Sequence, residues 1–177
     1  MNEERLIIAC REQDRKAQKE LYDTYARRMM AVCLRYVNDR EKALDLLQDG
    51  FVKVFMAIDS YAGSGSFEGW IRKIMVNVCL ESLRRTDILR DAVELDKGEE
   101  IEASNDSPIS ALSEKELRQL IAELPDGFRT VFNLFAIEGY SHKEISEMLN
   151  INESTSRSQY NRARQVLQRK VNKLYAN

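Results

Sequence analysis

The chain has 177 residues, 44% of them hydrophobic, and a formal net charge of -2, which suits one large domain or two small ones with ordinary cores. No apolar run approaches the roughly 18 to 20 residues of a membrane helix, and the N-terminus lacks a signal-peptide pattern, so we expect a soluble, cytoplasmic protein without membrane insertion. One histidine, His142, and three isolated cysteines leave almost nothing for a zinc site, a disulfide framework or a catalytic Ser-His or Cys-His pair.

Apolar residues recur at helical spacing through the N-terminal half, and no segment shows the alternation of apolar and polar residues that is typical of a strand. The pattern predicts helices over residues 4–15, 16–38, 40–58 and 67–85. A glycine- and serine-rich loop, residues 63–66, precedes the last of these.

The predicted 40–58 helix has two distinct faces. One face is apolar and can pack on a core, with Leu44, Leu47, Phe51, Val54 and Phe55. The other carries Asp45, Gln48, Asp49 and Val52. Carboxylates at four-residue steps also fit a divalent-metal site or a plain solvated face. Because no facing helix offers further carboxylates, we expect neither a metal nor a cofactor.

The predicted 67–85 helix likewise has two faces. Its packing stripe consists of Phe67, Trp70, Ile71, Ile74 and Val78, and Trp70 is interpreted as a core anchor. A second face carries Lys73, Asn77, Glu81 and Arg84. The basic and amide groups of this face suit contacts with a nucleic-acid backbone and with bases.

Charge is distributed unevenly in the second half of the chain. Residues 91–126 hold 11 acidic and 3 basic side chains, whereas residues 127–177 hold 4 and 8. Acidic residues mixed with Ser, Asn and Pro over residues 87–112 predict a flexible acidic linker. We therefore expect an all-α protein with two small helical domains, residues 1–86 and 113–177, on either side of this linker.

The C-terminal domain is predicted to contain a helix-turn-helix. After helices over residues 114–123 and 128–138, Ser141 and Glu144 form a capping box, and the 150–152 turn separates that helix from an arginine-rich one. The polar side of the last helix comprises Arg157, Ser158, Asn161, Arg162, Arg164, Gln165, Gln168 and Arg169. The guanidinium group of arginine can bind guanine edges and phosphates. The pattern therefore favours a helix that binds in the major groove of DNA over a basic helix that is merely solvated.

Three segments together resemble the extracytoplasmic-function (ECF) group of the sigma-70 family, the dissociable promoter-recognition subunits of bacterial RNA polymerase. They are ALDLLQDGFVKVF at residues 43–55, SFEGWIRKIMVNVCLESLRR at residues 66–85, and the stretch of residues 124–167 that includes the helix-turn-helix. Two departures from the family pattern are Gly50, where a residue with a side chain is usual, and Met75, where alanine is usual. A glycine costs about 1 kcal/mol against alanine in an exposed helix interior.

The resemblance implies a sigma-70 region 2 domain at residues 1–86 and a region 4 domain at residues 113–177. It assigns core-polymerase binding to Asp45, Gln48, Asp49 and Val52. It assigns minus-ten recognition and melting to Ser64, Phe67, Arg72, Lys73, Asn77, Arg84 and Arg85. It assigns duplex minus-thirty-five recognition to Arg157, Ser158, Gln159, Asn161, Arg162 and Arg164.

The resemblance further implies a non-enzymatic protein with no catalytic residues, monomeric when free, that binds core polymerase, duplex and single-stranded promoter DNA, and an anti-sigma factor. Two other classes remain open at this point. A dimeric helix-turn-helix repressor or activator explains the C-terminal segment only. A small metal-dependent nucleic-acid enzyme would use Asp45 and Asp49.

Overall fold

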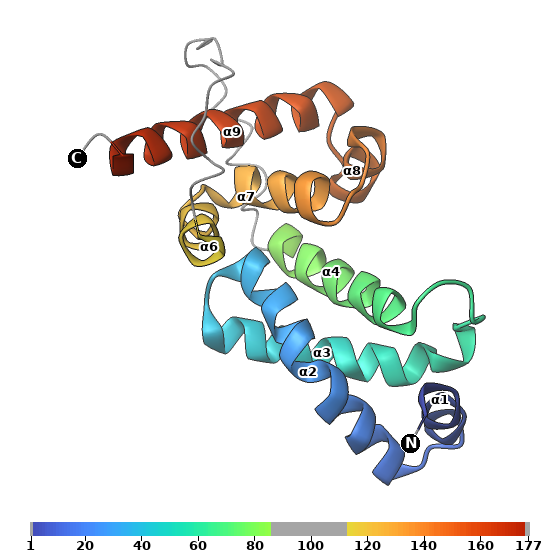
Figure 1. Cartoon of the computed structure of the whole chain (residues 1–177). Coiled ribbons are helices and arrows are strands. Elements are labelled where there is room, and N and C mark those ends of the chain that lie inside the picture. The colour runs from blue at the N-terminus through green and yellow to red at the C-terminus, as the bar shows by residue number, and fades with distance from the viewer. Residues whose placement is uncertain (1, 86–112, 176–177) are drawn as a thin grey trace. The chain divides into compact units, whose positions relative to one another are not determined.

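The computed structural model describes residues 2–85 and 113–175, and every regular element within these ranges is a helix (Figure 1). The expected all-α fold class is thereby confirmed. The chain divides into two compact units, with the boundary after Ser82. The predicted acidic linker, residues 87–112, lies outside the described residues. Within the described ranges, no helix is both long and apolar enough to cross a membrane.

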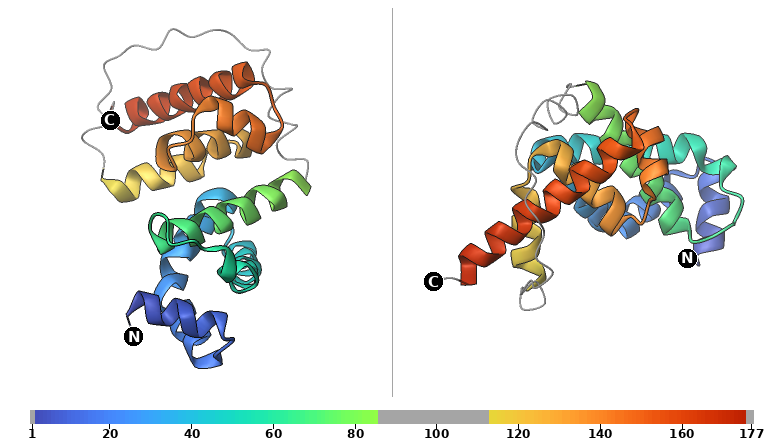
Figure 2. Two further views of the ribbon diagram at one scale, coloured as in Figure 1. Left: turned by 90° about the vertical axis from the view of Figure 1, so that its right-hand side faces the viewer. Right: turned by 90° about the horizontal axis from the view of Figure 1, so that it is seen from above.

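The N-terminal unit contains α1 (Glu3–Arg11), α2 (Arg15–Val37), α3 (Arg40–Ala57), a 3-10 turn η1 (Ile58–Ser60) and α4 (Phe67–Arg85). Figure 2 shows these helices in two further views. The first helix ends at Arg11 instead of at residue 15, because the Asp14 side chain accepts the backbone N–H groups of Lys16 and Ala17 and so begins α2.

Helices α2, α3 and α4 supply the core of this unit. Its buried side chains include Leu21, Met29, Tyr36, Val54, Ile71 and Leu80. All three cysteines are buried free thiols, and burial raises the pKa of Cys10 to about 11. The prediction that Leu44 faces the core is wrong: the residue is 43% exposed, since it lies at the edge of the α3 stripe that packs through Ala43, Leu47 and Val54.

Gly50 marks a close approach between α3 and α4. A Cβ added at Gly50 would overlap the Sδ atom of Met75 and lie 2.8 Å from its Cε atom, and Met75 is itself fully buried. The two departures from the family pattern are therefore one feature, because the missing side chain at residue 50 makes room for the long side chain at residue 75. Gly50 is a packing residue and not an exposed helix position.

This pairing predicts a reversal of sign in a double-mutant cycle. Gly50→Ala should destabilise the wild-type chain by up to about 2 kcal/mol, because overpacking against the buried end of the Met75 side chain costs about 1 to 3 kcal/mol and the better helix propensity of alanine returns about 1 kcal/mol. In a Met75→Ala background, the same change should stabilise the chain, since the overlap is gone and alanine is the better helix former by about 1 kcal/mol. Urea unfolding of the four proteins tests this expectation, and an equal effect of Gly50→Ala in both backgrounds would contradict the pairing.

The C-terminal unit contains α6 (Glu114–Ala122), α7 (Asp126–Phe132), a π-helical turn η3 (Asn133–Ile137), α8 (His142–Leu149) and α9 (Glu153–Tyr175). Ser113 and Ser141 cap α6 and α8 through capping boxes with Glu116 and Glu144. Helix α9 packs against α6, α7 and α8 (Figure 1). One part of the core joins α6 to α9 through Leu120, Ile121, Leu124, Ala163, Leu167 and Val171.

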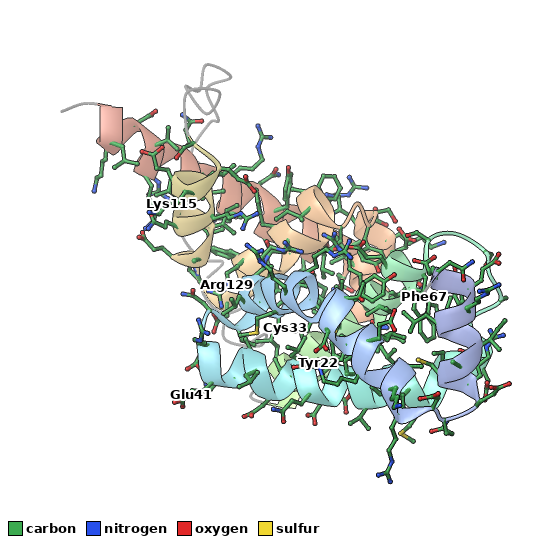
Figure 3. The ribbon with its side chains drawn as sticks, turned by 60° about the horizontal axis from the view of Figure 1, so that its bottom comes forward. Tyr22, Cys33, Glu41, Phe67, Lys115 and Arg129 are labelled. Carbon is green, nitrogen blue, oxygen red and sulfur yellow. The ribbon has the colours of Figure 1, made fainter. Side chains whose placement is uncertain are left out.

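A buried arginine holds the turn between α6 and α7. The Arg129 side chain is 5% exposed, and its Nη1 donates to the carbonyl oxygens of Ala122 (3.1 Å) and Leu124 (2.9 Å). Its Nη2 donates to the Asp126 carboxylate. Figure 3 labels Arg129 within this unit. The guanidinium therefore links two backbone carbonyls, one at the last residue of α6 and one in the turn that follows it.

Candidate nucleic-acid interface

The C-terminal unit contains the expected helix-turn-helix. Asn150 ends α8 in the left-handed conformation, with φ 53° and ψ 49°, and the Ile151 N–H donates to the Ser146 carbonyl at 3.1 Å. Three residues separate α8 from α9. The turn therefore forms through the residue that tolerates a positive φ, as the sequence predicts.

The outer side of α9 presents the recognition surface, which we define as Arg157, Ser158, Asn161, Arg162 and Arg164. Arg157, Asn161 and Arg164 are exposed, and Ser158 and Arg162 are partly buried. Arg157 also pairs with the exposed Glu153 carboxylate one turn earlier, a contact that contributes little in water. The surface thus offers three guanidinium forks and an amide along the helix, the donors and acceptors that base edges and phosphates need.

Gln159 does not belong to this surface. The residue is only 6% exposed, because it lies on the packed stripe of α9 that continues through Ala163 and Leu167. A side chain in that position has no direct access to a DNA groove. The prediction that Gln159 contacts DNA is therefore corrected by its burial.

A cluster of aromatic side chains packs against α9 at Tyr160. The His142 ring stacks on Phe135 with centroids 4.2 Å apart, and Phe135 also packs against Tyr160 of α9 at 4.6 Å. His142 Nδ1 shares a 2.9 Å hydrogen bond with the Oγ atom of Ser156. Burial first, and then the charge of Arg157, lower the pKa of His142, while Glu153 opposes this shift. The imidazole thus connects the two helices of the motif in its neutral form.

A stability change with pH follows from this environment. Because the folded pKa of His142 lies below the unfolded value, near 6.5, the unfolded chain binds more protons between the two values. Stability is therefore fully present above about pH 6.5 and falls as the pH drops toward the folded pKa. In unfolding experiments between about pH 7.5 and 5.5, wild type should lose more stability than His142→Asn. Equal losses would contradict the expectation.

In the N-terminal unit, the polar face of α4 is exposed as predicted from helical spacing. Lys73, Asn77 and Arg84 are exposed, and Arg72 is half-buried. The side chain of Arg85 lies outside the described part of the structure. Beside this face, Lys53 of α3 pairs with Glu81 at 2.7 Å, which joins the two helices. The face retains a lysine, an amide and an arginine directed to solvent.

Phe67 is placed differently from the prediction. The residue is fully buried at the start of α4 (Figure 3), where its ring stacks on Trp70 with centroids 5.6 Å apart and an interplanar angle of 12°. Tyr25 and Tyr61 complete this aromatic cluster. A side chain enclosed in this way cannot capture a base directly, so the assignment of Phe67 to minus-ten contact is corrected. Its packing instead supports the exposed loop before it.

That loop connects η1 to α4 and projects into solvent. Residues 62–66, which include Ser64, are all exposed. Gly63 and Gly65 adopt φ values of 77° and 80°, and a Cβ at either position would meet no atom within 4 Å. The loop therefore has an open outer surface.

The outer face of α3 carries a further exposed surface. We define the α3 surface as Asp45, Gln48, Asp49, Val52 and Met56, all exposed, with Val52 at 57% and Met56 at 80%. Met56 was absent from the predicted set, although it follows Val52 by four residues and so shares its face. The α3 surface therefore combines two carboxylates with two solvent-exposed apolar side chains.

The alternative metal site would use Asp45 and Asp49 of α3. Among residues 2–85 and 113–175, no three His, Cys, Asp or Glu side chains come together in a way that could hold a metal ion. Asp45 and Asp49 lie on the exposed surface of α3.

The geometry defines a helix-turn-helix protein with a second, separate helical unit. Two family models match the chain: sigma-70 region 2 over residues 21–88 and sigma-70 region 4 over residues 114–167. The ECF RNA polymerase sigma-E factor of Salmonella typhimurium is 30% identical over 96% of this chain and 94% of its own length. The ECF sigma factor SigW of Bacillus subtilis is 29% identical over 91% and 92%.

A solved structure has a related fold. It is the sigma factor RpoE of Bartonella quintana, crystallised with the anti-sigma factor NepR, at 20% identity with a TM-score of 0.51 over 85% of this chain and 94% of that one. On the sequence matches, this chain belongs to the ECF sigma factors of the sigma-70 family. It is a transcription initiation factor that directs core RNA polymerase to promoter DNA.

Proposed function

We propose that the two units divide promoter recognition between them. The region 2 unit, residues 1–86, docks on core polymerase through the α3 surface and captures the melted minus-ten box with its 62–66 loop and the polar face of α4. The region 4 unit, residues 113–177, reads the minus-thirty-five box as duplex through the recognition surface. The observation that best supports this division is the exposed stripe of Arg157, Asn161 and Arg164 on a helix-turn-helix.

In this proposal the chain supplies specificity and polymerase performs the chemistry, so the protein is not an enzyme. Its place of action is the cytoplasm, where core polymerase meets the chromosome. Anti-sigma control is part of the proposal as well, because the related RpoE structure contains an anti-sigma factor. Such a partner would keep the chain from core polymerase until a signal releases it.

Transcription in vitro tests the proposal. Purified chain and sigma-free core polymerase are mixed with a pool of random promoter sequences, and the selected start sites are sequenced. We expect two enriched boxes, one melted and one duplex, at a fixed spacing. A chain that forms a homodimer on two-fold sites and leaves core polymerase inactive would instead support a free-standing regulator.

The recognition surface yields a residue-level prediction. Arg162→Ala should weaken binding of the holoenzyme to its minus-thirty-five box by about 1 to 3 kcal/mol and relax the preference at one base position. Competition binding on promoters that carry each base at each position measures this. Lys173→Ala, on the same helix but outside the polar side defined above, is the control and should leave binding unchanged. A loss of equal size on every sequence would make Arg162 a phosphate contact.

A further inference from the structure

Arg11, at the end of α1, reaches the chain that leads into the 62–66 loop. Its Nη2 donates to the carbonyl oxygen of Tyr61 at 2.6 Å, and its Nε donates to that of Ile58 at 3.4 Å. The Asp59 carboxylate lies 3.9 Å from the same Nε atom. Figure 1 shows α1 beside the end of α3, in agreement with the contacts between α1 and η1. One guanidinium thus binds the carbonyls at the start and just after the end of η1, across 47 to 50 residues of sequence.

Helix α1 is itself firmly placed. Leu6, Ile7 and Cys10 are buried, and the Tyr25 hydroxyl of α2 donates to the Glu3 carboxylate at 2.7 Å. Arg11 therefore extends from a fixed support. This helix precedes residues 21–88, the part of the chain that matches the region 2 family model, so the match assigns it no role.

The loop is anchored at both ends and open between them. At its start, the Tyr61 ring packs on Phe67 and Trp70, with centroids 4.9 Å and 5.6 Å away, and its hydroxyl donates to the Gly65 carbonyl at 2.9 Å. At its end, the Ser66 hydroxyl accepts the Gly69 N–H and so caps α4. Two positive-φ glycines make the span between these anchors entropically costly to order.

We propose that Arg11 is a positioning residue for minus-ten recognition. It holds the carbonyl oxygens of Ile58 and Tyr61 so that the loop is already in its binding shape when an extruded base arrives. A loop ordered beforehand binds more tightly than one that must be ordered by its ligand. A site that is also held in one geometry admits fewer alternative bases. The inference depends on the proposed role of this loop. It assigns Arg11 no contact with DNA, because the guanidinium is engaged with backbone carbonyls.

Arg11→Lys tests the inference, because lysine keeps the positive charge but cannot donate to both carbonyls in the geometry of the planar guanidinium. Arg11→Lys also preserves the cation in the last turn of α1. In transcription by the holoenzyme, we expect this variant to lose roughly three- to tenfold of the discrimination between minus-ten boxes that differ at one base. Discrimination between minus-thirty-five boxes, core-polymerase affinity and the unfolding midpoint should remain those of wild type.

Two control variants separate the outcomes. Arg5→Lys changes an exposed arginine on the same helix and should have no effect. Ser64→Glu places a negative charge on the outer surface of the loop and should reduce minus-ten discrimination. If Ser64→Glu has no effect, the proposed role of the loop fails, and the inference fails with it.

If Ser64→Glu acts but Arg11→Lys behaves as wild type, the positioning role alone is overturned. If Arg11→Lys is normal while Arg11→Gln weakens initiation equally at all promoters, Arg11 is a phosphate contact and the inference is wrong. Parallel losses of stability and of both discriminations in Arg11→Lys would also overturn it, in favour of a general structural role.

Discussion

Replacing Arg129 with methionine is expected to destabilise the C-terminal unit by about 2 to 4 kcal/mol. Methionine fills similar space but removes the donor to both carbonyls. The buried bond to Leu124 is worth about 1 to 3 kcal/mol when its acceptor loses the donor, and the part-buried bond to Ala122 adds about 1 kcal/mol. Asp126 is partly solvated, so its loss of a partner adds less. A unit of this size has a stability of roughly 3 to 9 kcal/mol, so the variant loses a large share of it.

The single tryptophan makes this prediction measurable in the full chain. Trp70 lies in the N-terminal unit, so its fluorescence reports unfolding there, whereas circular dichroism reports the helices of both units. In Arg129→Met, the dichroism transition should shift to lower urea and the fluorescence transition should remain in place. Arg118→Met is the control, because it removes only an exposed ion pair with Glu114. An unshifted dichroism transition in Arg129→Met would show that its hydrogen bonds contribute little.

The sequence predicted most helices well because each carries its own local signals. Capping boxes at Ser113 and Ser141 and the left-handed Asn150 depend on a few neighbouring residues, so they can be identified without knowing the tertiary fold. The π-helical turn η3 was not predicted, because hydrophobic spacing does not distinguish it from a continuing α-helix. The family resemblance, in turn, came from motifs and not from periodicity.

The site residues were harder to predict, because helical spacing does not show which residues at the border of an apolar stripe are buried and which are exposed. Gln159 lies four residues before buried Ala163, so extending the packed stripe backward would have found its burial. Phe67 had been assigned to both the packing stripe and the DNA surface, and the packing role is the one that the structure confirms. The Gly50 and Met75 pair could not be predicted at all, because it requires knowing which helices meet and where.

A charge on the α3 surface is expected to have the largest effect on function. Val52→Asp should weaken binding to core polymerase at least tenfold, because it places a carboxylate where the proposed interface buries an exposed aliphatic side chain, one turn after Asp49. The fold should be preserved, since Val52 is 57% exposed on the outer side of α3. Competition against a labelled sigma factor for core polymerase measures the affinity.

Ile8→Asp is the matched control for this change. Ile8 is also an aliphatic residue, 53% exposed, but it lies on α1 and is not part of the α3 surface. The same substitution there should leave polymerase affinity unchanged while altering charge and exposed apolar area to a similar extent. If both variants lose affinity equally, the effect is one of net charge or stability. If neither variant loses affinity, polymerase does not dock on the α3 surface. A buried, unpaired carboxylate within that interface would lower the affinity measurably.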